Sequence, residues 1–234
     1  MENIKTKIAI FILIILIIAL IVVSYLYSNF NNTQMNLLTS EANKILETNL
    51  KDGEIDLSLK TEDDYAKVEK SIKEYLFKIK NIYVEMEQLI SGINPNTIFS
   101  VSNMPEKNLD EIDNIIEEYK EKCQNLISEY EELIKDENIK INMENYDISS
   151  RKEYYFNLYN DVMLSDVMKK KYNDLEDEIK NEKASLYDKL NKIEKIKDFL
   201  EEYDDSWTIK GDKIQFTNLN RMTEYYNLFN QVID

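Results

Sequence analysis

The segment that decides the fold runs from Tyr65 to Leu89 and reads YAKVEKSIKEYLFKIKNIYVEMEQL. Its apolar side chains recur at alternating steps of three and four residues: Tyr65, Val68, Ile72, Tyr75, Ile79, Ile82, Met86 and Leu89. That spacing is typical of the a and d positions of heptads, which form one apolar seam along an α-helix. Thr61 precedes the segment as the expected N-cap, and Gly92 follows it as the expected end. The segment therefore predicts a long helix that packs against another helix.

Two further segments show nearly the same spacing. After a loop expected around 97–105, the second seam consists of Leu109, Ile112, Ile116, Tyr119, Cys123, Leu126, Tyr130 and Leu133. A loop over 136–148 then leads to the capping box Ser150-x-x-Glu153, and helix is expected from there to Tyr203 with one break near 164–166. The third seam consists of Tyr172, Leu175, Ile179, Leu186, Leu190, Ile193, Ile196, Leu200 and Tyr203. Long helices joined by short loops bury such seams most economically as antiparallel neighbours.

The C-terminal segment changes character. Residues 206–216 read SWTIKGDKIQF, which predicts a β-hairpin with a two-residue Gly211-Asp212 turn, because such turns need glycine or a similar residue at the first position. In that register Trp207 faces Phe216 and Ile209 faces Ile214. A lone hairpin is marginally stable, so this apolar face is expected to pack on the helices. A last helix is expected over 218–232.

The N-terminal segment predicts a membrane anchor. From Ile8 to Val23 the chain reads IAIFILIILIIALIVV, and the stretch continues to Tyr27, which gives the roughly 20 residues that a helix needs to cross the hydrocarbon core. The core is longer than that of a cleavable signal peptide and lacks an A-x-A site, so we expect a retained anchor. Lys5 and Lys7 precede it and no charged residue occurs over 28–40, which places the N-terminus in the cytoplasm and the following domain outside.

These segments together predict an all-α fold, namely an elongated antiparallel helical bundle or coiled-coil hairpin with one N-terminal transmembrane helix and a small C-terminal β-hairpin. The expected divisions are a cytoplasmic tail (1–7), the transmembrane helix (8–27), a juxtamembrane helix and extended segment (28–60), the helical bundle (61–205), and the hairpin with its terminal helix packed on the bundle (206–234). The juxtamembrane helix either continues the transmembrane helix or follows a short break at 29–32.

The composition excludes many kinds of active site. The 234 residues include no histidine, one cysteine, three glycines and two prolines. His-based triads, His-ligated metals, multi-Cys zinc sites, disulfide scaffolds and Gly-rich phosphate loops are therefore not expected. A net charge of -16 argues against a face that binds nucleic acid or anionic lipid, because a long-range repulsion would have to be overcome first.

Catalysis and cofactor binding are not expected. The 45 carboxylates lie mainly on the polar faces of amphipathic helices, where they are solvated. Asp204, Asp205 and Asp212 flank the hairpin, but their spacing does not match a calcium-binding loop. Cys123 falls in the second seam and is interpreted as a small buried apolar side chain rather than a reactive thiol.

The aromatic run over 154–159 (YYFNLY), with Val162 and Met163, is the most informative cluster. On a helix these apolar groups spread over about 200°, which is wider than one core-facing stripe. One interpretation is that they pack on the similar run over 225–229. The other is that Phe156, Tyr159 and Met163 form a partner-binding surface, since interfaces are enriched in aromatic residues and methionine.

The sequence favours a membrane-anchored, acidic helical-bundle protein outside the cell that acts as an interaction, adaptor or scaffold module at the envelope. Its partners would be the membrane and a protein, and it could form oligomers. One alternative is an extracytoplasmic accessory subunit of a sensor, working through another membrane protein. A second is a cell-wall hydrolase that uses only carboxylates, which needs a concave site and a raised carboxyl pKa.

Overall fold

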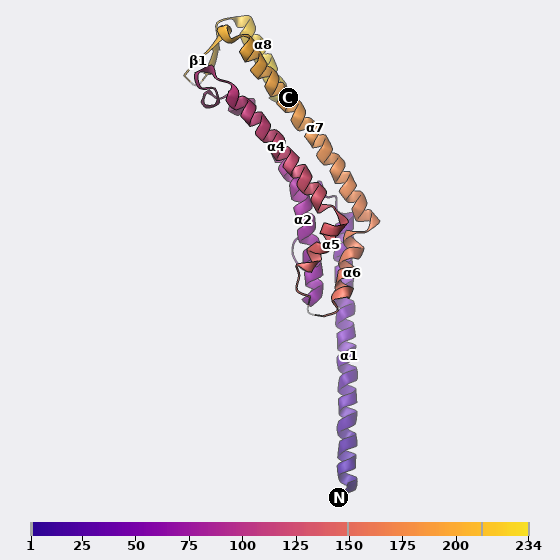
Figure 1. Ribbon diagram of the computed structural model, residues 1–234. Helices are drawn as coiled ribbons and strands as arrows, with labels where there is room; N and C mark the ends of the chain where they lie inside the picture. Colours follow the sequence, from indigo (N-terminus) through magenta and orange to yellow (C-terminus); the bar gives the residue numbers. More distant parts are fainter. Residues whose placement is uncertain (1, 149, 212, 234) are drawn as a thin grey trace. The chain divides into compact units, whose positions relative to one another are not determined.

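The computed structural model describes residues 2–148, 150–211 and 213–233, with side chains from Ile14 onward. The chain is mostly helical (79 %), with a two-stranded antiparallel sheet and one long apolar N-terminal helix (Figure 1). The α-helices are α1 (Glu2–Glu47), α2 (Asp63–Ser91), α3 (Pro95–Ile98), α4 (Asp110–Leu133), α5 (Asp136–Glu144), α6 (Lys152–Met163), α7 (Asp166–Glu202) and α8 (Leu219–Ile233). The remaining elements are the 3-10 turns η1 (Val101–Asn103), η2 (Pro105–Lys107) and η3 (Asp204–Ser206), and the strands β1 (Trp207–Lys210) and β2 (Lys213–Phe216). A mostly helical fold with a small hairpin is thereby confirmed, whereas the elongated bundle stays a prediction.

The chain divides into two compact units. Unit 1 comprises Met1–Asn49, Gly53–Tyr75 and Lys140–Met168. Unit 2 comprises Leu50–Asp52, Leu76–Ile139 and Lys169–Asp234. The C-terminal part of α1 thus belongs to the same unit as the first half of α2.

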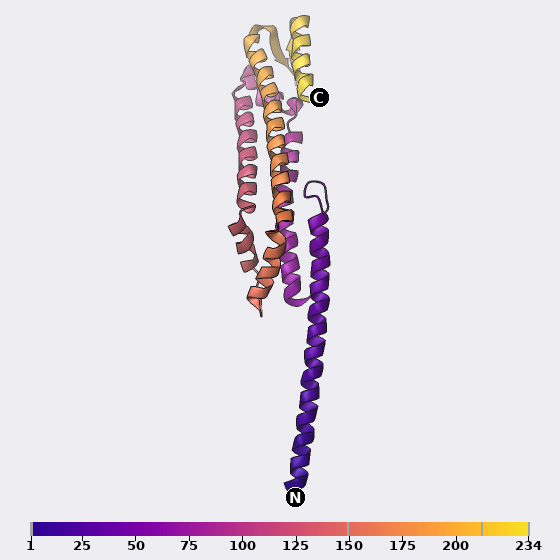
Figure 2. The same cartoon turned by 90° about the vertical axis from the view of Figure 1, so that its right-hand side faces the viewer.

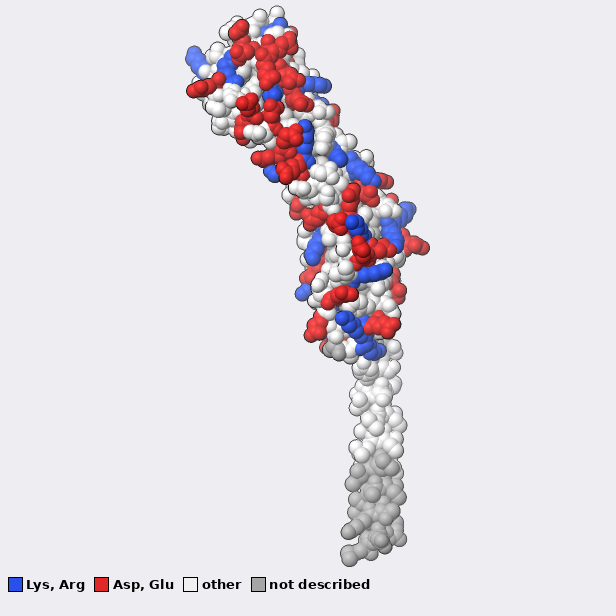
Figure 3. All heavy atoms as spheres, in the orientation of Figure 1, with Lys and Arg blue, Asp and Glu red and all other residues white. Residues whose placement is uncertain are grey.

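Helix α1 is a single α-helix from Glu2 to Glu47, without the break that was one option at 29–32. The described part over Ile14–Glu47 is long and apolar enough to cross a membrane, with a mean hydropathy of 2.0 in its most apolar window. Residues 14–40 of this helix carry no charge, and Figure 3 shows the exposed part of the stretch in white. The predicted apolar helix is confirmed. The side chains of the expected tail over 1–7 lie outside the described residues.

The core of unit 1 forms where the outer part of α1 meets the first half of α2 and the helix α6. Three apolar side chains of α1 are buried at helical spacing: Leu38, Ala42 and Ile45. From α2 the seam residues Tyr65, Val68, Ile72 and Tyr75 are buried, as predicted. From α6 the buried side chains are Tyr155, Tyr159 and Met163. The same seam spacing that predicted the helix therefore supplies its buried face.

Three local predictions in this region are wrong. Thr61 does not cap α2, which begins at Asp63, because its hydroxyl donates instead to Glu69. Ser150 does not form the expected capping box, since α6 begins at Lys152 after Arg151 in the left-handed conformation, with no side-chain cap. The segment over 136–148 is not all loop: α5 forms there because Ile139 and Met143 are both buried at helical spacing.

Unit 2 contains the second half of α2 together with α4 and α7. The hydroxyl of Tyr119 donates to the carbonyl of Gly92. Contacts between α4 and α7 pair Asp113 with Lys197 and Tyr130 with Tyr172, so residue numbers rise along one helix as they fall along the other. These two helices therefore lie side by side in opposite directions, as Figure 1 shows. Most residues of their predicted seams are buried.

The hairpin has the predicted register, with Trp207 opposite Phe216 and Ile209 opposite Ile214. Gly211 has a φ of 65°, the left-handed value that this turn requires, while Asp212 lies outside the described residues. The indole nitrogen of Trp207 donates to the carbonyl of Leu200 at 2.7 Å, and the Phe216 ring lies 5.1 Å from that of Tyr225. The apolar face of the hairpin thus packs on α7 and α8, which lie beside each other in Figures 1 and 2.

Candidate functional site

A buried charge network joins α1 to α2 inside unit 1. The ammonium of Lys73 donates to Glu69 Oε1 at 2.6 Å and to Glu41 Oε2 at 2.9 Å. The ammonium also donates to the carbonyl of Ser58 at 2.7 Å. The side chains of Lys73, Glu41 and Glu69 are 2 %, 7 % and 1 % exposed, so this is a nearly dry cluster of one cation and two anions.

The excess negative charge in this network is met by further donors. Glu69 Oε2 accepts from the hydroxyl of Thr61 at 2.7 Å and from its backbone N–H at 2.9 Å. The N–H of Lys60 also donates to Glu69, and Lys44 contributes its ammonium to Glu41. Every charged group is thus hydrogen-bonded, which is the condition for burying an ion pair without a large penalty.

The network holds its members in their charged forms. Burial is the largest influence on Glu69 and opposes ionisation, but the bonds from Lys73, Thr61 and the backbone outweigh it and lower the pKa of Glu69. The pKa of Glu41 is lowered in the same way by Lys44 and Lys73 against its burial. The two carboxylates raise the pKa of Lys73 although its burial lowers it. General acid–base catalysis needs a pKa near the working pH, and these shifts move away from neutrality.

A second cluster surrounds Arg151, and we call it the Arg151 cluster: Arg151, Tyr27, Tyr65, Tyr154 and Tyr155. The guanidinium carbon lies 4.7 Å from the ring centre of Tyr154, 5.6 Å from that of Tyr155 and 6.0 Å from that of Tyr27. The Tyr65 and Tyr155 rings meet edge to face at 5.0 Å. Three rings within about 6 Å of one guanidinium make a strong cation–π site.

The polar contacts of Arg151 are few. Its Nη2 donates to Asn31 Oδ1 at 3.2 Å and to the Tyr155 hydroxyl at 3.4 Å. Burial raises the pKa of Tyr155, while the hydrogen bond and charge of Arg151 lower it in part. The phenol therefore stays neutral at pH 7, which keeps its ring a suitable partner for the cation.

Sequence reasoning missed Arg151. The sequence placed Tyr27 at the end of the apolar stretch and the Tyr154–Tyr155 pair in an aromatic run, but it gave no means of joining positions 27 and 154. The only local signal is that a helix begins directly after an isolated arginine in a chain with two arginines in total.

The three residues of the predicted partner-binding surface do not share one exposed face. Tyr159 and Met163 are fully buried in unit 1, and the Tyr159 hydroxyl accepts a bond from Asn142 Nδ2 at 3.3 Å. Phe156 is half-buried, with the Lys152 ammonium 5.1 Å from its ring centre. The prediction that Tyr159 and Met163 lie on an exposed surface therefore has to be corrected. Both side chains lie in the core, because the wide apolar arc of α6 faces α2 and α5. Whether Phe156 contacts a partner stays a prediction.

The aromatic runs over 154–159 and 225–229 each make ring contacts within their own unit, and the packing of one run on the other stays a prediction. Tyr154 and Tyr155 contact Tyr65 inside unit 1. In unit 2, Tyr225 contacts Phe216 and Phe199. Each aromatic run therefore completes the core of its own unit.

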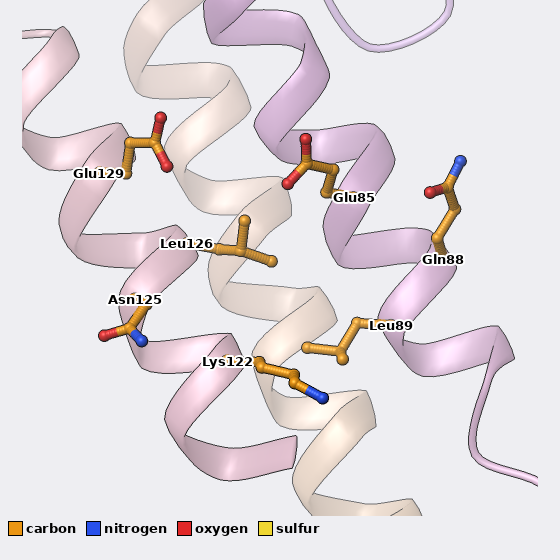
Figure 4. A pocket seen from close by; sticks show the side chains of 7 residues that line it. All are labelled: Glu85, Gln88, Leu89, Lys122, Asn125, Leu126 and Glu129. Carbon is orange, nitrogen blue, oxygen red and sulfur yellow. The ribbon is translucent and has the colours of Figure 1, made fainter. Parts of the chain in front are cut away.

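Unit 2 has several surface hollows, and two of them are large enough to consider as sites. The first is an open groove of about 460 Å³ between α2 and α4 (Figure 4), and it is lined by Glu85, Gln88, Leu89, Lys122, Asn125, Leu126 and Glu129. Leu89 and Leu126 are seam residues that stay half-exposed because the two helices leave this gap. The second, of about 560 Å³, is lined by Asn96, Phe99, Ser100, Val101, Ser102, Lys213, Ile214, Tyr225, Tyr226 and Phe229.

Neither hollow has the donor set of a metal centre. Among the residues that the structure describes, no group of three or more carboxylates and thiols is placed to hold a metal ion. Cys123 is buried, and burial raises the pKa of its thiol.

In comparisons with known proteins, no family model, curated protein or solved structure matches this chain.

Proposed function

We propose that this protein is a membrane-anchored interaction or scaffold module that holds an acidic helical bundle at the outer surface of the cell envelope. The observation that carries the proposal is the continuity of α1, which runs without a break from the apolar stretch to Glu47. The last turns of the same helix supply Leu38, Glu41, Ala42 and Ile45 to the core of unit 1. An anchor that is itself part of the core holds unit 1 at a fixed distance from the bilayer.

The buried charge network supports this role. A buried ion pair contributes little net stability, but its geometry disfavours any other register of the two helices. Sliding α1 by one residue would carry Glu41 away from Lys73 and leave a buried charge without its partner. The network thus specifies how the anchor helix docks on α2, which suits a protein that works by position.

The orientation follows from the charges around the span. Lys5 and Lys7 precede the apolar stretch, while residues 28–40 carry no charge. Under the positive-inside rule the bundle is extracytoplasmic. The depressed pKa values of the most buried carboxylates support a non-catalytic role, since a carboxylate hydrolase needs one raised pKa.

Cysteine labelling tests the anchor and its orientation. In a Cys123→Ser background, the exposed Lys210 is replaced in one variant (Lys210→Cys) and the uncharged tail residue Thr6 in a matched control (Thr6→Cys). A membrane-impermeant maleimide added to intact cells should label the first variant, and the control only after permeabilisation. The reverse pattern would overturn the orientation, and release of the labelled domain into the medium would overturn the retained anchor.

Site-specific photo-crosslinking tests the interaction role. A photoreactive residue at half-exposed Leu126, in the groove of Figure 4, or at exposed Tyr226 should give a discrete adduct in intact cells. The same residue at exposed Lys170 is the control. An adduct of twice the chain's mass would indicate self-association. The absence of an adduct from both test positions, Leu126 and Tyr226, would contradict a scaffold role.

A further inference from the structure

The depth of the Arg151 cluster relative to a bilayer follows from α1. If Ile8–Tyr27 fills the hydrocarbon core, its 20 residues span about 30 Å at 1.5 Å per residue. Asn31 lies one turn further along, about 6 Å beyond Tyr27. The headgroup layer on each side of the core is roughly 5–8 Å thick. Because Arg151 contacts both the Tyr27 ring and Asn31, its guanidinium lies in that layer.

The hydrogen-bonding capacity of Arg151 is only partly used. A guanidinium carries five N–H donors. Among the described residues, Nη2 of Arg151 donates to Asn31 and to the Tyr155 hydroxyl at distances above 3.1 Å, and the Tyr65 side chain is a further partner, so the acceptors are all neutral. Within the described part of the chain, no carboxylate lies at ion-pair distance from it. Asp64, which faces the neighbouring Ser150, is itself paired with Lys67 at 2.8 Å.

The second arginine of the chain shows what a satisfied guanidinium looks like. Arg221 also stacks on a tyrosine, 3.6 Å from the ring centre of Tyr203, but it is paired with the carboxylate of Glu224 at 2.5 Å. Arg221 lies in unit 2 and Arg151 in unit 1. Both arginines stack on a tyrosine ring, but only Arg221 of the two is paired with a carboxylate among the described residues.

The backbone at Arg151 adds a further point. Its φ and ψ are 45° and 44°, in the left-handed region that glycine and asparagine adopt more readily. A residue held in such a conformation is a reason to look for a role of its side chain. Packing does not account for the arginine, since the residue is exposed.

We propose that Arg151 binds the phosphate of a phospholipid headgroup in the outer leaflet, with the tyrosines of the Arg151 cluster holding the guanidinium plane. This deepens the proposed function and rests on it, because the depth argument requires α1 to span the membrane. The planar fork of arginine matches two phosphate oxygens, and the stacked rings reduce the freedom lost when the bond forms. The net charge of -16 does not prevent the contact, since repulsion between separated surface charges is screened beyond about 8 Å at physiological salt.

Lipid retention tests the proposal with the full chain. The protein is placed in nanodiscs containing equal amounts of phosphatidylcholine and a galactosyl diacylglycerol, which lacks phosphate. After mild extraction, the masses of the lipids that remain bound are determined. We expect the wild type to enrich the phospholipid on the order of tenfold over the galactolipid, the size expected for a charge-assisted bidentate contact.

Three variants separate the guanidinium from the fold. Arg151→Gly suits a φ of 45° and so should fold at least as well as the wild type, yet the enrichment should be lost. Arg151→Gln should lose it as well, while the matched control Arg221→Gln should keep it. Enrichment that persists in Arg151→Gly, or that disappears equally in Arg221→Gln, would overturn the proposal.

Three other outcomes identify where a failure lies. If the phospholipid is displaced by excess inorganic phosphate, the site takes a soluble anion and the lipid assignment is overturned. If the chain does not remain in the nanodisc, the anchor itself is refuted and this proposal falls with it. If the chain remains in the nanodisc without enrichment, only the lipid contact is refuted.

Discussion

At Lys73, three bonds hold one ammonium that is 2 % exposed: two to carboxylates and one to a backbone carbonyl. The neighbouring Lys44 also bonds Glu41 but is 65 % exposed. The two lysines therefore make the same kind of contact to one carboxylate at opposite extremes of solvation. Removing one partner of a buried pair leaves an uncompensated charge, whereas an exposed pair contributes little.

Replacing Lys73 by methionine should therefore lower the free energy of unfolding by about 3–5 kcal/mol, and Lys44→Met by less than ~1 kcal/mol. Denaturant unfolding of the full chain in detergent, followed by circular dichroism, measures both. Equal effects of the two substitutions would show that the interior position of Lys73 has no energetic consequence.

The cost of Lys73→Met should depend on pH. The pKa values of Glu41 and Glu69 in the folded chain are lowered from the ordinary glutamate value of 4.5, so their contribution to stability is present above that pH and is lost as pH falls through the folded pKa. Protonated carboxyls no longer need the ammonium. The difference in the free energy of unfolding between wild type and variant should thus be constant between about pH 6 and about pH 8, and it should shrink below about pH 4. A difference that grows in acid would contradict the assigned charge states.

Cys123 offers a probe that needs no substitution. Its side chain is fully buried in α4, and burial raises the pKa of the thiol, so the reactive thiolate is scarce. Iodoacetamide should modify it at least about a hundredfold more slowly in the folded chain than in denaturant, since reaction requires opening of unit 2. Rapid labelling of the native chain would show that α4 presents a different face.

At the scale of elements, the heptad spacing sufficed to predict the positions of α2, α4 and α7 and their buried faces. Seven of the eight seam residues from Tyr65 to Leu89 are buried, and Leu89 is half-exposed beside the groove. The hairpin register could also be predicted, because a two-residue turn fixes which residues face each other. These features depend only on residues close in sequence.

The ends of helices and the candidate site could not be predicted in this way. Thr61 has the right residue type for an N-cap, but its hydroxyl donates a hydrogen bond to the Glu69 carboxylate, which lies further along α2. The Arg151 cluster joins residues more than 120 positions apart, through contacts that exist only once α6 docks on α1. Nothing in the local pattern around either residue carries that information.

The helix α6 provides a test of the corrected assignment of its aromatic face. Tyr159 is fully buried and Phe156 is half-buried, so Tyr159→Ala should destabilise the chain by about 3–5 kcal/mol and Phe156→Ala by about 1–2 kcal/mol. Denaturant unfolding again provides the measurement. If Phe156 also contacts a partner, Phe156→Ala should reduce crosslinked adduct in cells while the folded population is unchanged. The opposite order of destabilisation would place Phe156 in the core.

At the scale of the whole molecule, α1 is both the long apolar helix and a part of the core of unit 1. Unit 1 draws Leu38, Ala42 and Ile45 from α1, together with Glu41, the partner of Lys73. The core of unit 2 includes α4 and α7 and takes only Leu50–Asp52 from the segment that follows α1. Removing the span and removing all of α1 should therefore have different consequences for the two units.

A fragment over 33–234 keeps the buried part of α1, whereas one over 50–234 loses all of α1 and keeps the Leu50–Asp52 segment of unit 2. The first should be soluble, highly helical and cooperatively folded. The second loses three apolar side chains worth roughly 1–3 kcal/mol each and leaves Lys73 without Glu41, so unit 1 should open. Hydrogen exchange resolves the two units: amides over 65–75 should lose protection in the shorter fragment by a factor of at least about a hundred, while those in α4 keep it. Equal protection over 65–75 in both fragments would mean that α1 is only an anchor, and loss of protection in α4 as well would mean that the two units fold as one.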